Sequence, residues 1–226
     1  MLLYLIRHGA TKGNIEKRYV GSTDETLTRE AVERLVEWRH RYSEQLSQVQ
    51  MVVVSPMKRC RQTADILFPG MRQYVVEDFR ECDFGAFEYR NFRELDGNAA
   101  YQRFIDSCGE CGFPGGEDRA AFQSRCVDGF EKLLSGFDED SLRDKTGIRV
   151  QAEAETEREC ESSGMHIALV VHGGTIMALL DRYSFPHRDY YDWQTDNGTG
   201  FIIEADRDLE TGEWKFNVIG TLDKVR

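Results

Sequence analysis

Three short apolar runs, each ending at polar residues and a glycine or proline, constrain the fold of this chain most strongly. They span Leu2–Arg7, Met51–Val54 and His166–Val171, and they are rich in leucine, isoleucine and valine. Runs of this length without polar alternation are typical of strands buried on both faces. Each of the three runs is followed along the chain by a segment with the apolar spacing of a helix. The alternation predicts a three-layer α/β sandwich, in which helices flank a mostly parallel central sheet.

The remaining elements are predicted from the same two periodicities. Helices are predicted over 28–46, 57–68 and 175–183, and strands over 73–76, 201–205 and 214–219. The last two strands flank Glu-Thr-Gly-Glu, a turn sequence that predicts a hairpin. Ser55 suits an N-cap and Pro56 suits the first helical position, so a helix is predicted to begin there, directly after the second apolar run.

We expect one domain over residues 1–226, in which two stretches interrupt the α/β rhythm. Residues 88–118 are predicted to form a cap inserted over one end of the sheet, with a helix over Phe92–Phe104. A second helix is predicted over Arg119–Leu134. Residues 138–163 hold nine acidic and four basic residues with little periodicity, which predicts an exposed acidic excursion.

The formal net charge of −11 limits the partners of the chain. An acidic chain lacks the basic face that a general nucleic-acid binder or a protein adsorbed on anionic membranes needs. No apolar run approaches the ~20 residues of a membrane-spanning helix. Residues 1–64 nevertheless hold 11 basic and 7 acidic residues, which is compatible with one small anion in a locally basic pocket.

The cysteines and the N-terminus indicate a reducing compartment. Six cysteines are too sparse for a disulfide scaffold, and the first apolar run ends after six residues, shorter than a secretory signal core. We therefore expect a cytoplasmic protein. Cys108 and Cys111 form a single CxxC without a second ligand pair, so they are predicted to be free thiols in a loop. The sequence does not define the oligomeric state.

Basic residues and histidines follow the three predicted strands. Arg7 and His8 end the first strand, Arg59 follows the second, and His172 follows the third. Because the carboxyl ends of parallel strands meet at one edge of a sheet, we expect these side chains to converge. Guanidinium groups bind phosphoryl oxygens in a bidentate manner, and a helix N-terminus attracts anions. The glycine after each histidine leaves room for close approach of the backbone. The sequence therefore predicts a phosphate site at this edge.

Six motifs occur in one order along the chain: Arg7-His8-Gly9-x-Thr11-x-x-Asn14, Tyr19-Val-Gly-Ser-Thr-Asp24-x-x-Leu27-Thr28, Ser55-Pro-Met-Lys-Arg59-x-x-Gln62-Thr63-Ala64, Glu81-Cys-Asp-Phe84-Gly85-x-Phe87-Glu88, Pro114-Gly-Gly-Glu117 and His172-Gly173. In these motifs the chain resembles the histidine phosphatase superfamily (phosphoglycerate mutase-like, branch 1). The resemblance implies the phosphoglycerate mutase-like fold. It also implies a phosphomonoester hydrolase that acts on a small phosphorylated metabolite through a phosphohistidine, with no metal ion or other cofactor.

The resemblance further implies a role for individual residues. His8 would be the nucleophile. Glu81 would protonate the departing alkoxide and then deprotonate the water that hydrolyses the intermediate. The phosphoryl group would be bound by Arg7, Arg59, His172 and, in an assisting role, Asn14. Further substrate contacts are predicted for Thr11, Ser22, Thr23 and Gly173.

Two alternatives to a phosphatase stay open. In cofactor-dependent phosphoglycerate mutases, His-Tyr-Gly and later an arginine pair follow the catalytic glutamate. Here Asp83-Phe-Gly-Ala-Phe-Glu-Tyr-Arg90 resembles the phosphatase pattern Asp-Phe-Gly-x-Trp-Glu-Gly, with Phe87 and Tyr89 as departures. This favours a phosphatase similar to α-ribazole-5′-phosphate phosphatases and broad-specificity phosphomonoesterases. The other alternative is a catalytically silent phospholigand-binding module, and the intact nucleophile and acid argue against it.

Two further questions concern the identity of the acid and the role of the aromatic residues in the predicted cap. Glu88 is the alternative candidate for the acid, while Asp83 is expected to cap the turn. The aromatic residues of the predicted cap either contact the substrate or form a small core under the cap. These residues are Phe92, Tyr101, Phe104 and Phe113.

Overall fold

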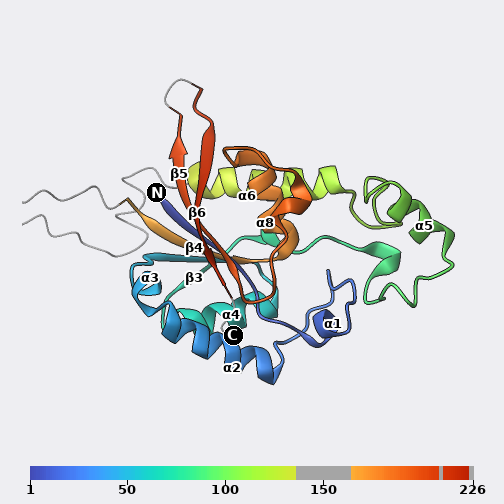
Figure 1. The fold of residues 1–226 in the computed structure, drawn as a ribbon, viewed down its shortest axis with the longest axis horizontal. Helices are drawn as coiled ribbons and strands as arrows, with labels where there is room; N and C mark the ends of the chain where they lie inside the picture. The colour runs from blue at the N-terminus through green and yellow to red at the C-terminus, as the bar shows by residue number, and fades with distance from the viewer. Residues whose placement is uncertain (136–163, 209–210, 224–226) are drawn as a thin grey trace, which may run out of the picture.

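A six-stranded sheet is the centre of the structure, a computed structural model in which residues 1–135, 164–208 and 211–223 are described. The strands are β1 (Leu2–Arg7), β2 (Met51–Val54), β3 (Gln73–Val75), β4 (His166–Val171), β5 (Gly200–Arg207) and β6 (Trp214–Leu222). Their order across the sheet is β3-β2-β4-β1-β5-β6 (Figure 1). The first four in this order are parallel, whereas β5 is antiparallel to β1 and to β6. The predicted mostly parallel sheet and the terminal hairpin are confirmed.

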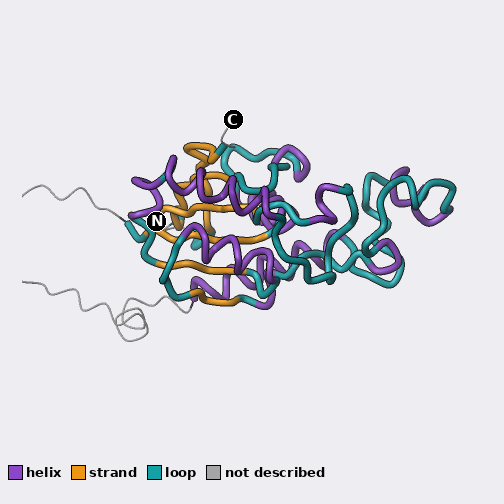
Figure 2. The backbone as a smooth tube through the Cα atoms, turned by 90° about the horizontal axis from the view of Figure 1, so that it is seen from below, coloured by secondary structure: helices purple, strands orange, loops and turns teal. Residues whose placement is uncertain are grey.

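Helices cover both faces of the sheet, as the predicted three-layer arrangement requires (Figures 1 and 2). The α-helices are α1 (Lys12–Ile15), α2 (Arg29–Arg41), α3 (Ser43–Ser47), α4 (Lys58–Leu67), α5 (Ala99–Asp106), α6 (Arg119–Ser135) and α8 (Gly173–Tyr183). Short 3₁₀ helices are η1 (Glu77–Phe79), η2 (Gly85–Phe87) and η3 (Tyr190–Trp193).

Two predicted helices differ from the observed ones. The helix predicted over 28–46 is divided at Tyr42, which leaves the helical conformation (φ −104°, ψ 22°) between α2 and α3. The helix predicted over Phe92–Phe104 begins only at Ala99, after the N-cap Asn98. The preceding residues form turns, because the Asn91 side chain accepts hydrogen bonds from the N–H groups two and three residues ahead. Local side-chain hydrogen bonds here replace helical ones.

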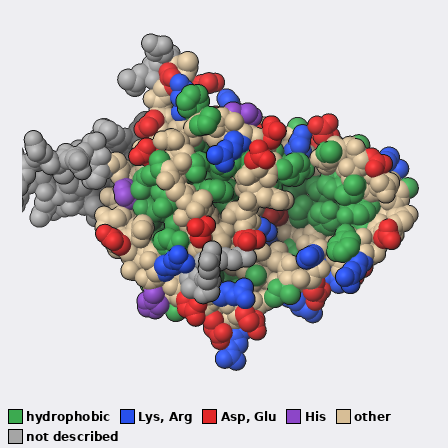
Figure 3. Space-filling model, viewed as in Figure 1, with side chains coloured by type: hydrophobic (Ala, Val, Ile, Leu, Met, Phe, Trp, Pro, Cys, Tyr) green, Lys and Arg blue, Asp and Glu red, His purple; other side chains and the backbone are tan. Residues whose placement is uncertain are grey.

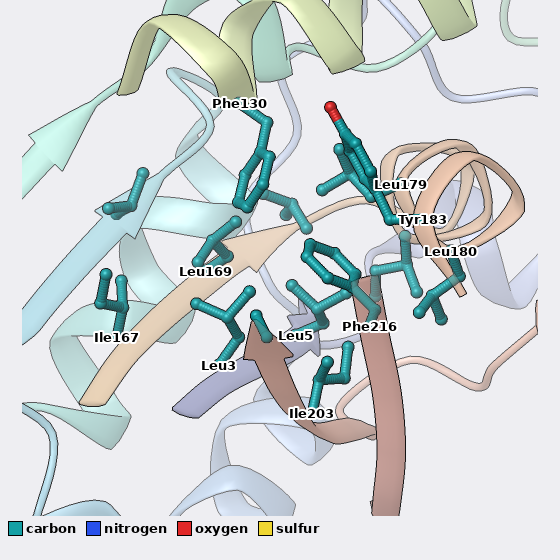
Figure 4. Close-up of a cluster of buried hydrophobic side chains, with 14 of the residues drawn as sticks. Leu3, Leu5, Phe130, Ile167, Leu169, Leu179, Leu180, Tyr183, Ile203 and Phe216 are labelled. Carbon is teal, nitrogen blue, oxygen red and sulfur yellow. The ribbon is translucent and has the colours of Figure 1, made fainter. Parts of the chain in front are cut away.

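Alternate residues of the strands supply two separate cores. Leu3 and Leu5 of β1 point to the face covered by α6 and α8, where they pack in the cluster shown in Figure 4. Tyr4 and Ile6 point to the other face, where they pack against side chains from α2 and α4. This period of two is what a strand buried on both sides produces, and it holds the carboxyl ends of the strands in a fixed position.

The hairpin of β5 and β6 offers a matched test of the core. Ile203 of β5 is fully buried in the cluster of Figure 4, whereas Ile219 of β6 is 48% exposed. We expect Ile203→Ala to lower the free energy of unfolding by about 2–5 kcal/mol, because it leaves a cavity between packed side chains. Ile219→Ala is expected to change it by about 1 kcal/mol or less. Urea unfolding measures both, and similar values for the two variants would contradict this assignment of the core.

The segment that contains α5 lies beyond the end of the sheet at which the site residues gather (Figures 1 and 2). It connects the turn after η2 with the start of α6, which is where a cap over residues 88–118 was predicted. The division into one domain with an inserted cap stays a prediction. The predicted acidic excursion over 138–163 lies outside the described residues.

Candidate active site

The aligned ends of β1 and β4 bring His8 and His172 together. Arg7, the last residue of β1, lies opposite Val171, the last residue of β4, so a histidine follows each strand at the same edge. The His8 N–H donates to the Val171 carbonyl oxygen at 3.0 Å, and the two imidazole centroids are 5.1 Å apart. Both side chains are buried. The two histidines therefore lie side by side, as parallel neighbouring strands require.

The ring of His8 is oriented by its own loop. Nδ1 lies 2.7 Å from the carbonyl oxygen of Gly9, which can only accept, so Nδ1 carries the proton and Nε2 keeps its lone pair. Burial, and then the charges of Arg59 and Arg7, lower the pKa of His8 well below its ordinary value of 6.5. The imidazole is therefore neutral at neutral pH, and Nε2 is available as a nucleophile.

Two buried guanidinium groups contribute positive charge to this edge. Arg59 donates through Nη1 to the Thr23 carbonyl at 2.9 Å, and through Nη2 to the carbonyls of Val20 and Gly21 at 3.2 and 3.1 Å. In the described part of the chain, the Nε atoms of Arg59 and Arg7 are buried and have no hydrogen-bond partner. An unpaired buried donor costs about 1–3 kcal/mol, so both atoms fit the oxygens of a bound anion.

The prediction that Ser55 and Pro56 begin the second helix is wrong. Helix α4 begins at Lys58, and the Lys58 N–H donates to Oδ1 of Asp24 at 2.7 Å. The buried Ser55 hydroxyl accepts from the Met57 N–H at 3.4 Å, before the helix begins, and it lies 2.7 Å from Nε2 of His172. Asp24 therefore binds the N-terminus of α4, and the two arginines are the cations of the site.

Glu81 lies next to His172. Its Oε2 is 3.8 Å from Nδ1 of His172, and its Oε1 accepts from the N–H of Cys82 at 3.0 Å. A Cβ on Gly174 would come within 2.8 Å of Oε1, so the start of α8 packs against the carboxyl group. Burial raises the pKa of Glu81 above its ordinary 4.5, although nearby arginines oppose the shift. A raised pKa keeps the proton on the carboxyl group closer to neutral pH, as an acid catalyst requires.

Glu88, the alternative acid, binds the loop that holds Arg59. Its Oε1 accepts from the N–H and the hydroxyl of Thr23 at 2.8 and 2.6 Å, and both carboxylate oxygens accept from the Gly21 N–H. Glu88 therefore fixes two of the residues whose carbonyls bind Arg59. Asp83 accepts from the N–H two residues ahead at 2.9 Å, so it caps the turn as predicted.

Thr11 and Asn14 form one turn beside His8. The Asn14 Oδ1 accepts from the N–H and the hydroxyl of Thr11 at 3.0 and 3.1 Å, and the Thr11 hydroxyl accepts from the Asn14 N–H, which closes a capping box at α1. Asn197 connects this turn to the nucleophile, because its Nδ2 lies 3.3 Å from Asn14 Oδ1 and 3.2 Å from the His8 carbonyl oxygen.

The other predicted substrate contacts lie in different surroundings. Ser22 is exposed, and the Thr23 hydroxyl donates to Glu88. A Cβ on Gly173 would lie 3.3 Å from Cζ of Arg7, so this glycine gives room to the guanidinium group. Gly9, the glycine after His8, is explained differently. A Cβ there would lie 2.8 Å from Cδ1 of Leu35, so this glycine makes room for α2 and not for an anion.

Sequence reasoning missed the segment before β5. Thr195 accepts a hydrogen bond from Arg7 Nη1 at 2.5 Å through its carbonyl, and Asn197 contacts the His8 carbonyl. The predicted C-terminal hairpin could have indicated that this segment lies at the site. An antiparallel strand next to β1 must begin where β1 ends, and Gly200 indeed pairs with Ile6, so the residues before β5 lie at the site.

A cavity of about 410 Å³ opens next to Arg7 and Glu81. Two of the predicted cap aromatics, Phe104 and Phe113, line it, and their ring centroids are 4.7 Å apart. Tyr101 packs against Phe104 behind this wall. Phe92 is 50% exposed and lies outside both the ring cluster and the cavity lining, so neither of the two alternatives for the cap aromatics is observed for this residue.

Three further observations concern the described residues. Cys108 and Cys111 are free and exposed, as predicted. Within the described residues, no group of three or more His, Cys, Asp or Glu could hold a metal ion. None of the helices in the described ranges is both long and apolar enough to span a membrane.

The fold and the site define a class of protein. Residues 3–142, more than half of the chain, match the model of the histidine phosphatase superfamily (branch 1). The chain belongs to this superfamily. Membership confirms the resemblance carried by the motifs.

Particular relatives are more distant. The chain is 29% identical over 127 residues to a probable phosphoglycerate mutase (GpmB) of Proteus mirabilis, which covers 54% of this chain and 58% of the mutase. It is 25% identical over 211 residues to a broad-specificity phosphatase of Saccharomyces cerevisiae, which covers 91% of this chain and 80% of the relative. The chain thus spans little more than half the length of the first relative.

Solved structures share the fold. The α-ribazole phosphatase of Shigella flexneri aligns with a TM-score of 0.67 at 19% identity, over 100% of this chain and 99% of that one. A phosphoglycerate mutase of Thermus thermophilus aligns with a TM-score of 0.64 at 23% identity, over 99% of both chains.

Proposed function

We propose that the chain hydrolyses small phosphomonoesters through a phosphohistidine on His8. The observation that carries the proposal is the neutral His8 ring: Nδ1 donates to a carbonyl, which leaves the lone pair on Nε2, and the charges of Arg59 and Arg7 act on the ring. In the first step Nε2 attacks phosphorus and the bond to the ester oxygen breaks. Arg7 and Arg59 stabilise the charge on the equatorial oxygens, and the Gly9 carbonyl stabilises the positive charge that develops on the ring.

Glu81 moves the proton in both steps of the proposed reaction. Its protonated carboxyl group gives a proton to the departing alkoxide. The resulting carboxylate then takes a proton from water, whose oxygen attacks phosphorus and breaks the P–N bond. Inorganic phosphate and neutral His8 are released, and Glu81 again holds its proton. His172 lies beside both His8 and Glu81, and the Ser55 hydroxyl holds its ring at the edge of the proposed phosphoryl site.

Hydrolysis of p-nitrophenyl phosphate tests this proposal. We expect turnover at mildly acidic pH in the presence of EDTA, because the chemistry needs only side chains of the chain. Loss of the activity in EDTA would overturn the metal-independent mechanism. Tight binding of inorganic phosphate without any turnover would support the silent binding module instead.

The natural substrate is a narrower question. α-Ribazole-5′-phosphate is the first candidate, since the Shigella flexneri structure with the same fold is named an α-ribazole phosphatase. The mutase name of the Proteus mirabilis relative supports a second candidate reaction. Isomerisation of 3-phosphoglycerate in the presence of catalytic 2,3-bisphosphoglycerate would identify it, and we expect none.

A further inference from the structure

The cavity beside Glu81 is lined mainly by aromatic and apolar side chains. Four of them come from the loop after α1 and from the cap side: Tyr19, Phe84, Phe104 and Phe113. Four come from α6, α8 and η3: Phe122, Met177, Tyr190 and Tyr191. Figure 3 shows hydrophobic side chains gathered in a hollow at the α5 end of the molecule. A volume of about 410 Å³ is in the usual range for a small-molecule site.

The first group of rings is packed yet not closed into a core. The ring centroid of Phe113 lies 4.9 Å from that of Phe84 and 4.7 Å from that of Phe104, and the centroid of Tyr19 lies 5.2 Å from that of Phe84. These ring pairs are edge to face or tilted. All four side chains stay partly exposed, whereas Phe87 behind them is fully buried. The rings therefore hold one another in place and present a face to the cavity. Both interpretations of the cap aromatics, mutual packing and a pocket wall, apply to Phe104 and Phe113.

The charges of the cavity are concentrated at its reactive end. Arg7 and Glu81 lie there, and among the described lining residues the one other charged side chain is Arg119. The Arg119 guanidinium lies 3.1 Å from Glu110 and 5.7 Å over the Tyr190 ring, so it already has an anionic partner. A second phosphate or carboxylate on the substrate would lose its water of hydration there and would compete with Glu110 for this cation.

Resting on the proposed function, we propose that the substrates are phosphomonoesters of uncharged apolar or aromatic alcohols, and that Phe104 and Tyr191 determine this specificity. The phosphoryl group lies at His8 and the leaving alcohol lies in the aromatic cavity. Tyr191 ties the two groups of lining residues together, because its hydroxyl donates to the Cys108 carbonyl of the cap at 3.2 Å. Burial of a phenyl group in such a site is worth about 10- to 100-fold in kcat/KM.

Two primary alkyl esters with similar leaving groups test the proposal: 2-phenylethyl phosphate and glycerol 1-phosphate. We expect kcat/KM to be at least about tenfold higher for the phenylethyl ester. Equal or higher kcat/KM for the glycerol ester would overturn the inference and leave the proposed hydrolysis intact. If neither ester nor p-nitrophenyl phosphate is hydrolysed, the proposed function fails and this inference fails with it.

Variants assign the preference to the cavity. Phe104→Ala, and separately Tyr191→Ala, should each lower the ratio of kcat/KM for the phenylethyl ester to kcat/KM for the glycerol ester by about fivefold or more. Circular dichroism shows whether each variant is folded. Phe92→Ala is the matched control, because this ring is exposed outside the cluster, and it should keep the wild-type preference. A preference that survives both cavity variants would overturn the assignment.

Discussion

Replacing His8 with alanine is expected to lower kcat for p-nitrophenyl phosphate by at least about 10⁴-fold. The estimate follows from the loss of a covalent nucleophile, since the remaining groups bind the ester but offer no atom that attacks phosphorus. No other histidine can take its place. The Nε2 of His172 is 2.7 Å from the Ser55 hydroxyl, and the pKa of His172 is lowered mainly by burial, which leaves that ring a neutral partner in a fixed contact.

The measurement has three parts. Steady-state kinetics give the loss of kcat, circular dichroism shows whether the variant is folded, and rapid acid-free quenching followed by mass spectrometry detects phosphate on the peptide that holds residue 8. His40→Ala is the matched control, because His40 is exposed near the end of α2, and it should keep wild-type kcat. Equal turnover by the wild type and His8→Ala would remove His8 from the mechanism.

The parts of the site that could be predicted are the residues at the carboxyl ends of the parallel strands. Arg7, His8 and His172 follow apolar runs whose ends are visible in the sequence, and the register of β1 against β4 then leaves little freedom in their positions. The same holds for the central sheet, because a continuous apolar run has few other ways to bury both faces. Burial also explains why the pKa of His8 and that of Glu81 shift in opposite directions, each towards the neutral form.

The parts that could not be predicted depend on side-chain hydrogen bonds between distant segments. Ser55 has the chemistry of an N-cap, but its hydroxyl lies 2.7 Å from His172 and accepts from Met57 two residues ahead, while Asp24 accepts from the first N–H of α4. Glu88 has the chemistry of an acid, yet it binds amides of the loop around Arg59. A local propensity states only what a side chain can do; which partner it meets is decided by tertiary packing.

Glu81→Gln is expected to have the second largest effect, and its form depends on the leaving group. For glycerol 1-phosphate or another alkyl ester, we expect the rate to fall by about 10²- to 10⁴-fold, because an alkoxide leaves slowly without a proton. For p-nitrophenyl phosphate the first step needs no acid, so a burst of about one equivalent of p-nitrophenolate per enzyme should precede slow turnover. Glutamine cannot take a proton from water, and the phosphohistidine therefore accumulates.

The pH dependence follows from the same proton. The pKa of Glu81 is raised, so in the wild type the acid is present at low pH and is lost as the pH rises through that raised value; hydrolysis of alkyl esters should fall on this alkaline side. The pKa of His8 is lowered well below 6.5 and that of Glu81 is raised, so the two shifts together widen the pH range in which a neutral nucleophile and a protonated acid coexist. Glu81→Gln should remove the alkaline limb, while Glu37→Gln, on the exposed surface of α2, should keep it. A wild-type rate and profile in Glu81→Gln on an alkyl ester would assign the proton transfer to another group.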